Sequence, residues 1–285
     1  MSDRIKVNKT SKLYIGGKFV RSESGRYYKT DAGKEPVNIC LGSRKDFRNA
    51  VVSARKAFSG WSGKSAYNRG QILYRIAEML EARKAQFAAE LVDSGASQRK
   101  ANDEVDQAID RLIYFAGWAD KYQQVFSTVN PVASAHFNFS VPEPTGVVAI
   151  IAPNENPLLS MITLIAPVIV GGNTCVILAP EQTPLPATSF AEVINSSDVP
   201  GGVVNILTGK EQELKEHISS HMDVNAVFYS GSNLETENII QEKASLNVKR
   251  VKLTDSKNWM DGSRENPYII LDFQEIKTTW HPVGL

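Results

Sequence analysis

The pattern of hydrophobic and polar residues divides the chain into an amino-terminal part rich in helices and a later part in which strands and helices alternate. Lys12–Val20 alternates around Gly16-Gly17, and two adjacent glycines favour a two-residue hairpin turn. From Arg44 to Gln123 apolar residues recur at helical spacing, most clearly in Arg69–Phe87, where charged residues occupy the opposite face. The pattern therefore predicts a β-hairpin followed by amphipathic helices.

Beyond Gly146, short unbroken apolar runs alternate with amphipathic segments. We expect strands at Val147–Ala152, Thr174–Leu178, Val203–Leu207, Ala226–Tyr229 and Val248–Leu253, and helices at Pro157–Val170, Pro186–Ser196, Glu211–His221 and Asn233–Lys243. Unbroken apolar strands between helices are typical of a parallel sheet covered on both faces. The sequence thus predicts an α/β fold whose centre is a doubly wound parallel-sheet domain of the nucleotide-binding type.

Two further segments have strand character. His136–Val141 alternates as a half-buried strand does, and Pro267–Trp280 has strong strand propensity. Between the large domain and this tail, Thr254–Asn266 is polar and rich in turn residues, which indicates a linker or surface loop. Because an apolar terminal strand exposes an edge that invites pairing, we predict that Phe273–Trp280 pairs with His136–Val141 in a small sheet.

Composition narrows the classes of partner. The 285 residues are 42% hydrophobic and 22% charged, with a net charge of +1, which gives no electrostatic footprint for nucleic acid or an anionic membrane. The apolar run Met161–Leu178 is interrupted at Gly171–Thr174, so it predicts a helix, a turn and a strand rather than a membrane span. The amino terminus is polar, without a secretory signal, and two cysteines are no disulfide framework, so we expect a cytoplasmic protein.

A set of short segments occurs in a specific order along the chain. They are YIGGKFV (Tyr14–Val20), AFSGW (Ala57–Trp61), GVVAIIAPNENPLL (Gly146–Leu159), IAPVIVGGNT (Ile165–Thr174), EQTP (Glu181–Pro184), VPGGVVNILTG (Val199–Gly209) and YSGS (Tyr229–Ser232). Taken together they resemble the aldehyde dehydrogenase superfamily over about residues 12–253. The resemblance implies a nucleotide domain of the NAD-binding type and a small oligomerisation sheet.

The resemblance also implies catalytic residues, and this chain departs from each of them. The family uses a cysteine nucleophile, and neither Cys40 nor Cys175 matches its position. Thr254 stands where the general-base glutamate is expected, and Asp255, one residue on, should face the opposite side of the strand. Glu155 stands in place of the asparagine that stabilises the oxyanion, which a carboxylate would repel.

Asn154 and Asn156 flank Glu155 and could supply the missing donor only through a shifted loop. Elsewhere, His217 and His221 lie four residues apart on a predicted helix, a spacing that can chelate a metal. Since no third ligand lies near in sequence, we expect a solvated helix end and no metal site.

Cofactor residues are retained only in part. Glu181 matches a glutamate that holds the adenosine ribose in the family, but Leu178 replaces its lysine partner. Glu211 replaces a glycine that lets the backbone approach the cofactor. Ser230-Gly231-Ser232 leads into a predicted helix, so its N–H groups form a candidate phosphate site, with an ordinary N-cap serine as the alternative. We expect NAD or NADP to bind weakly or not at all.

The tail segment FQEIKTTW (Phe273–Trp280) resembles the family's carboxyl-terminal strand, which belongs to its oligomerisation sheet. A rival alignment sets PYIIL (Pro267–Leu271) against the opening strand of the catalytic domain. We divide the chain into residues 1–130 (hairpin and helices), 131–145 with 267–285 (oligomerisation strands), 146–253 (Rossmann-like domain) and 254–266 (a linker replacing the catalytic domain).

The departures from the family's site lead to the hypothesis of a non-catalytic structural or regulatory subunit. Its expected partner is a second copy of itself or a full-length aldehyde dehydrogenase. The alternatives are a weak NAD(P)-binding module or sensor, and an oxidoreductase active only in complex with a catalytic partner.

Overall fold

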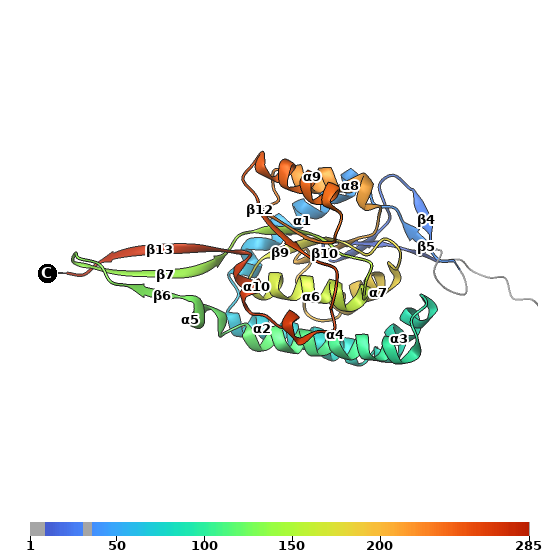
Figure 1. The fold of residues 1–285 in the computed structure, drawn as a ribbon, viewed down its shortest axis with the longest axis horizontal. Helices are drawn as coiled ribbons and strands as arrows, with labels where there is room; N and C mark the ends of the chain where they lie inside the picture. Colours follow the sequence, from blue (N-terminus) through green and yellow to red (C-terminus); the bar gives the residue numbers. More distant parts are fainter. Residues whose placement is uncertain (1–8, 31–35, 285) are drawn as a thin grey trace, which may run out of the picture.

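The central element of the fold is a seven-stranded sheet in the order β12-β11-β8-β9-β10-β2-β3. The computed structural model describes residues 9–30 and 36–284, and Figure 1 shows their arrangement. Neighbouring strands from β12 to β10 pair in parallel. These strands are β8 (Val147–Ile151), β9 (Thr174–Leu178), β10 (Val204–Leu207), β11 (Ala226–Ser230) and β12 (Arg250–Thr254). The predicted doubly wound parallel sheet is confirmed.

Helices cover both faces of this sheet (Figure 1). One face carries α6 (Pro157–Val170) and α7 (Leu185–Asn195), and the other carries α1 (Arg44–Ser62), α8 (Glu211–Ser220) and α9 (Leu234–Ser245). The alternation of side chains along each strand creates the two cores. In β8, for example, Val148 and Ile150 lie in the first core, whereas Val147, Ala149 and Ile151 lie in the second.

The amino-terminal helices form a layer behind α6 and α7. They are α2 (Ala66–Glu81), α3 (Lys84–Asp93), α4 (Gln98–Trp118) and the short α5 (Tyr122–Phe126). The helical pattern of Arg69–Phe87 is not one helix, because α2 ends at Glu81 and α3 begins at Lys84. The periodicity continues across this short break since α3 turns its own apolar residues, Phe87 and Leu91, into the same core.

The predicted hairpin consists of β2 (Leu13–Ile15) and β3 (Lys18–Val20). Gly16 and Gly17 have φ angles of 61° and 78°, which glycine adopts without steric cost. The hairpin also extends the main sheet, since β2 pairs antiparallel with β10. A separate sheet contains β1 (Thr10–Ser11), β5 (Asn38–Cys40) and β4 (Tyr27–Lys29). Most of the polar amino-terminal stretch lies outside the described residues.

The third sheet, which we call the arm, consists of β6 (Thr128–Asn130), β7 (His136–Pro144) and β13 (Gln274–Pro282). β13 pairs antiparallel with β7 over its whole length, from Gln274 opposite Pro144 to Pro282 opposite His136. The predicted pairing of the tail with this strand is therefore confirmed. Figure 1 shows the arm extending away from the layered body of the molecule.

The chain between the main sheet and the arm differs from the prediction. Pro267–Trp280 was expected as one strand, but Tyr268–Leu271 forms the short helix α10 and the strand begins at Gln274. The helical turn places Ile270 and Phe273, three residues apart, in the main core, where both are fully buried. Pro267–Leu271 is therefore not a strand in this structure, whichever of the two alignments describes its origin.

The segment Thr254–Asn266 is more than a surface linker. Trp259 is 1% exposed and belongs to the main core. The Arg264 guanidinium lies 4.4 Å from the centre of its ring, and Gly262–Arg264 forms a 3-10 turn. On α4, the fully buried Arg111 donates to the carbonyl oxygens of Trp259 at 3.3 Å and Asp261 at 3.5 Å. No helix of the described ranges is long and apolar enough to cross a membrane.

Candidate functional site

The residues matched to the family's cofactor, base and oxyanion positions lie at one edge of the main sheet. Each lies at or just after the carboxyl end of a parallel strand, which is where open α/β sheets bind ligands. The structure joins several of them directly. The Glu181 carboxylate accepts a hydrogen bond from the Glu211 N–H, the Gly231 N–H donates to the Thr254 carbonyl, and the Ser230 hydroxyl donates to the Asp255 carbonyl.

Glu181 caps the helix that follows the next strand. Its Oε2 lies 3.1 Å from the backbone nitrogen of Glu211, the first residue of α8. Its carbonyl accepts a 3.4 Å hydrogen bond from Tyr28, whose pKa is raised by burial and then by the Glu181 charge. Leu178, at the position of the family's lysine, is 3% exposed and packs in the second core. This carboxylate is thus engaged within the protein, without the ammonium partner that the family would supply.

The amino terminus of α9 is closed by a side chain that the sequence interpretation missed. Asn233 is the N-cap, and its Oδ1 accepts from Glu235 N at 3.0 Å and Thr236 N at 3.2 Å. Ser232 is exposed, and Ser230 is buried with its hydroxyl turned to a backbone carbonyl. Asn233, and neither serine, is therefore the N-cap, and it already pairs two of the N–H groups at this helix end.

Tyr229 fills the space beside Gly231. A β-carbon added at Gly231 would clash with the Tyr229 hydroxyl, so the phenol lies directly against this backbone. Burial, followed by the nearby Glu211 carboxylate, raises the pKa of Tyr229 to about 12, which keeps the phenol neutral. Glu211 itself accepts a 3.0 Å hydrogen bond from the Thr236 hydroxyl. A phenol and a carboxylate thus lie where an anionic group would have to approach.

A buried lysine joins this network. Lys215 on α8 is 2% exposed, and its Nζ lies 3.3 Å from the Thr236 hydroxyl and 3.9 Å from a Glu235 carboxylate oxygen. The sequence did carry a signal for it. Lys215 falls next to Leu214 on the buried face of the helix, where a charged residue needs an internal partner.

The position of the general base is also occupied by internal contacts. The Thr254 hydroxyl accepts a 2.8 Å hydrogen bond from Arg264. The Asp255 carboxylate accepts from the Lys257 N–H and pairs with Arg264, and these two contacts hold its pKa below the usual range. A carboxylate with a lowered pKa is a weak base near neutral pH, so neither residue can serve as the family's glutamate does.

The loop after β8 gives no oxyanion donor. Glu155 is exposed. Asn154 accepts a 2.9 Å hydrogen bond from the Gln182 N–H through Oδ1, and Asn156 donates 3.2 Å to Glu104 through Nδ2. Both amides that flank Glu155 therefore have structural partners, and the arrangement does not restore the missing asparagine.

Glu104 is a further residue that the sequence interpretation missed. Its Oε1 accepts from Leu158 N at 2.9 Å and Leu159 N at 3.3 Å, so a carboxylate from α4 caps the amino terminus of α6. Burial raises its pKa. Glu104 lies on the apolar stripe of α4 beside Ala101 and Ala108, and this unusual position was the available signal.

The thiols and histidines have structural surroundings. Cys175 is fully buried, and burial raises its pKa to about 12, which leaves almost no thiolate, while Cys40 is 3% exposed. His217 and His221 are half-buried around Phe47 rather than solvated, with ring centroids 5.6 Å apart, and burial lowers the pKa of both. Within the described part of the chain, no three His, Cys, Asp or Glu residues cluster as metal ligands.

Taken together, these residues do not fit NAD or NADP in the family's manner. The ribose position has a leucine in place of a cation, the helix cap is satisfied by Asn233, and Tyr229 covers Gly231. The Glu211 carboxylate accepts a hydrogen bond from the Thr236 hydroxyl, so it places a negative charge near this helix end.

Comparison with known proteins places this architecture in a family. The family model for the aldehyde dehydrogenase family matches residues 19–277. An aldehyde dehydrogenase from Aspergillus niger is 36% identical over 255 residues, which cover 87% of this chain and 50% of that protein. The cytosolic 10-formyltetrahydrofolate dehydrogenase of Mus musculus is 34% identical over 249 residues, covering 85% of this chain and 28% of that protein.

Solved structures agree. The NAD+ complex of aldehyde dehydrogenase from Bacillus cereus is similar with a TM-score of 0.81 and 27% identity, covering 87% of this chain and 51% of that one. The chain thus spans about half, or less, of the length of these relatives: 50%, 28% and 51%. Since the family model covers most of the sequence and the fold superimposes on solved members, the chain belongs to the aldehyde dehydrogenase family.

Proposed function

We propose that this chain is a non-catalytic structural or regulatory subunit that assembles through the arm. The observation that carries the proposal is an apolar arm face that the described chain leaves uncovered. The departures at Thr254 and Glu155 support the non-catalytic part, because their surroundings offer neither a base nor an oxyanion donor. Cys175, which does not match the nucleophile's position, is buried and offers no thiolate.

The register of the arm defines its two faces. Directly paired residues share a face, so Val129, Phe139 and Thr279 lie on one side together with Phe137 and Val141. Phe137 is 46% exposed and Val129 is 69% exposed, and the rings of Phe137 and Phe139 lie 5.5 Å apart. We call this side the apolar face.

The other side of the arm is mainly polar near its centre. Asn130 donates to Asn138 at 2.6 Å and to Ser140 at 2.9 Å, and the hydroxyls of Ser140 and Thr278 are 2.8 Å apart. These side chains satisfy one another across the three strands. The register also places Lys277 and His281 of β13 on the apolar face and the exposed Ile276 and Trp280 on the other side, so the apolar cluster is confined to β6 and β7. Exposed apolar side chains that gather on two neighbouring strands favour burial against a partner, so this cluster is the part of the arm that we propose a partner covers.

The partner that we propose is a full-length aldehyde dehydrogenase, with a second copy of this chain as the alternative. The family match at residues 19–277 includes β6, β7 and the start of β13, which supports a related arm in full-length members. Two related arms can meet face to face or edge to edge, because β6 and β13 both leave an unpaired edge.

Val129→Asp and Phe137→Asp are expected to weaken association at least tenfold, because each buries a charge in the proposed interface. Thr128→Asp is the matched control, since Thr128 is exposed and its register places it on the polar face, beside Ser140. Sedimentation velocity of the chain alone, and mixed with a full-length family member from the same organism, measures the effect.

Deleting residues 276–285 should abolish the same association. The deletion must leave Phe273 and Gln274 in place, because both are buried and Gln274 donates to the Gly171 carbonyl at 3.1 Å. A shortened chain that still binds the same partner would contradict the proposal, as would Val129→Asp and Thr128→Asp having equal effects.

A nucleotide-binding module or sensor is the competing function, and the similarity to an NAD+ complex favours it. Against it stand the buried Leu178 and the closed end of α9. Losing one charge-assisted hydrogen bond costs roughly 1.5–3 kcal/mol, a factor of about ten to a hundred in affinity. We therefore expect a dissociation constant for NAD near or above the millimolar range.

The double change Leu178→Lys with Glu211→Gly should strengthen NAD binding by about tenfold or more, because it restores a donor beside Glu181 and removes a negative charge. Titration calorimetry measures both chains. Leu178→Lys with Glu213→Gly is the matched control, since Glu213 is exposed in the same first turn of α8. Micromolar affinity of the unaltered chain would instead support the sensor.

A further inference from the structure

The outer edge of β13 is a strand edge with which no other strand of the described ranges pairs. The arm has the strand order β13-β7-β6, so β13 has a neighbour on one side only, and Figure 1 shows it along the border of the arm. Every residue from Ile276 to Pro282 is exposed. An uncovered strand edge presents backbone N–H and C=O groups that pair readily with another strand.

Hydrogen bonds at the two ends of the β7–β13 ladder show which backbone groups are free. Thr145 N donates to the Phe273 carbonyl at 3.2 Å, and Val283 N donates to the Ala135 carbonyl at 3.1 Å. Both pairs continue the register of the ladder and join odd-numbered residues. Hydrogen-bonded and non-hydrogen-bonded pairs alternate in an antiparallel ladder. The odd-numbered residues of β13 therefore bond to β7, and the even-numbered ones point their N–H and C=O groups to the open edge.

Three exposed residues offer both backbone groups at this edge, namely Ile276, Thr278 and Trp280. At one end the row stops at Gln274, which is 1% exposed where the arm meets the body of the molecule. At the other end it stops at Pro282, which has no N–H. Thr278 lies midway between these two limits.

A second copy of the same strand fits this edge. When two copies of β13 run antiparallel about a two-fold axis at Thr278, Thr278 faces its own copy and Ile276 faces Trp280 in both directions. Each of these pairs exchanges two backbone hydrogen bonds, so the contact contains about six. Moving the axis by one residue would set one of these residues against Gln274 or Pro282, so the axis at Thr278 is the one that leaves every pair complete.

The side chains that flank Thr278 agree with this pairing. Ile276 is 56% exposed and Trp280 is 57% exposed, and both lie on the side of the arm opposite the apolar cluster. About the two-fold axis each Trp280 lies directly opposite an Ile276. Aromatic and β-branched side chains in directly opposed positions stabilise antiparallel strands.

On the other side of the sheet the same pairing sets unlike side chains against each other. Glu275 faces His281 of the second copy, and Lys277 faces Thr279 of the second copy. The two Lys277 residues lie diagonal to each other, about 7–8 Å apart. Like charges directly opposite each other would destabilise the strands, and this register has none.

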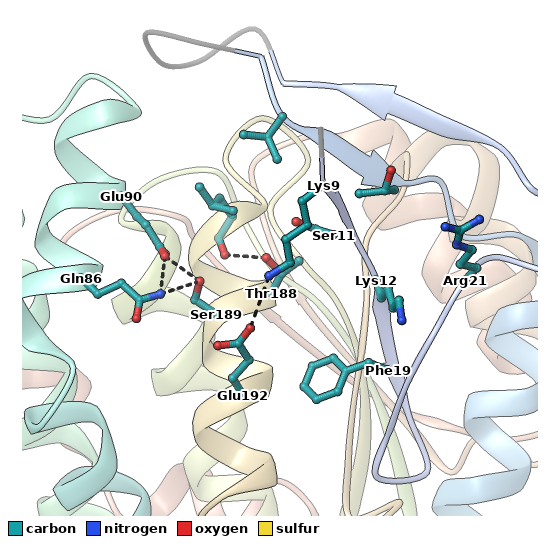
Figure 2. Close-up of a pocket in the computed structure, with 13 residues that line it drawn as sticks. Lys9, Ser11, Lys12, Phe19, Arg21, Gln86, Glu90, Thr188, Ser189 and Glu192 are labelled. Carbon is teal, nitrogen blue, oxygen red and sulfur yellow. Dashed lines mark hydrogen bonds and ion pairs between the residues drawn. The ribbon is translucent and has the colours of Figure 1, made fainter. Parts of the chain in front are cut away.

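The cavity of about 610 Å³ between α3, α7 and the amino-terminal strands differs from this edge. Figure 2 shows that its acidic groups have partners within the chain. The Glu90 carboxylate accepts from the Ser189 hydroxyl at 2.7 Å and from Gln86 at 2.8 Å, and Glu192 lies 3.9 Å from the ammonium group of Lys9. The edge of β13, by contrast, presents a row of backbone groups that no described strand satisfies.

We propose that the chain forms a two-fold homodimer in which β13 pairs with β13 of a second copy, with Thr278 at the axis. The two three-stranded arms then form one continuous sheet. This contact rests on the proposal that the arm mediates assembly, but it uses the edge of β13. The apolar cluster on β6 and β7 stays free for a different partner, so the two contacts are tested separately.

Cross-linking tests the position of the axis. Thr278→Cys should give a disulfide-linked dimer of the full 285-residue chain under mild oxidation, because Cα atoms of a hydrogen-bonded pair lie about 5.5 Å apart, which a disulfide spans. Lys277→Cys is the matched control, since this exposed neighbour lies about 7–8 Å from its own copy. The native thiols Cys40 and Cys175 are buried. Equal cross-linking of the two variants, or none with Thr278→Cys, would overturn the proposal.

Thr278→Pro should raise the dissociation constant of the homodimer at least about tenfold, because it removes the outward N–H of both copies and places a ring at the edge. The β7 ladder does not use this N–H, so the arm itself should remain paired. Thr278→Val is the matched control, because both variants lose the 2.8 Å hydroxyl contact with Ser140 but valine keeps the N–H. Sedimentation equilibrium measures the dissociation constants, and thermal melting checks the fold of each variant.

Val129→Asp separates this contact from assembly through the apolar cluster. In the chain alone it should change the dissociation constant of the homodimer by less than about twofold, because β6 is the strand of the arm farthest from the edge. Dissociation by Val129→Asp but not by Thr278→Pro would refute the β13 contact and assign the homodimer to the apolar cluster. The reverse result supports the β13 contact, and the mixture with a full-length family member then tests the apolar cluster by itself.

Discussion

Trp259→Ala is expected to lower the free energy of unfolding by about 3–5 kcal/mol, the usual cost of removing a fully buried large aromatic side chain. Trp259 is 1% exposed, its indole N–H donates to the Ser256 carbonyl at 3.0 Å, and Arg264 covers its ring. Loss of the indole would also loosen the backbone at residue 259, whose carbonyl oxygen accepts a hydrogen bond from Arg111. Urea denaturation followed by circular dichroism measures the change.

Met260→Ala provides the matched control, because Met260 is the next residue and is 41% exposed. Its effect should stay within about 0.5 kcal/mol, as for surface substitutions generally. If Trp259→Ala were equally mild, residues 254–266 would be a detachable linker, and their packing against α4 would not contribute to the stability of the domain.

The second large effect concerns catalysis. The purified chain should oxidise aliphatic and aromatic aldehydes with NAD or NADP several orders of magnitude more slowly than a full-length family member, as expected when nucleophile and base are both lost. The physical reasons are the buried, protonated Cys175 and the Thr254 hydroxyl held by Arg264. Absorbance of the reduced cofactor measures the rate.

Cys40→Ala and Cys175→Ala should leave any residual rate unchanged. Robust turnover that disappears with Cys175→Ala would contradict the non-catalytic hypothesis. Adding the chain to a full-length family member whose own nucleophile has been replaced tests the remaining alternative, an oxidoreductase active only in complex. Turnover recovered in that mixture would favour the alternative over a purely structural subunit.

The main fold could be predicted because its physical determinants are local. The unbroken apolar runs that become β8, β9, β10 and β11 can only be buried on both faces, and the segments between them have one apolar side. The tail was harder to predict. Pro267–Leu271 has high strand propensity, yet Tyr268–Leu271 forms α10. The helical turn buries Ile270 and Phe273 in the core together, whereas a strand would place them on opposite faces and expose one of them.

The candidate site was predictable in its residues but not in its contacts. The order of motifs identified Glu181, Ser230 and Thr254, and the structure places them at one edge of the sheet, since the carboxyl ends of parallel strands share an edge. It could not reveal that Asn233 rather than a serine caps α9, or that the Tyr229 phenol lies against Gly231. These contacts depend on which of several nearby side chains lies within hydrogen-bond distance of a donor in the folded structure.

The sequence by itself determined the doubly wound sheet, the helical layer behind α6 and α7, and the residues that stand at the positions matched to the family's site. Each of these follows from residue identity and spacing. The tertiary structure alone decided where the polar residues find their partners: Arg111 under residues 259–261, Glu104 on the first turn of α6, Lys215 beside Thr236 and Glu90 at a cavity wall. The reason is physical. The periodicity of apolar residues can predict that a charged residue is buried. Its partner comes from an element that is distant in sequence and becomes adjacent only after folding, so the sequence pattern does not identify it.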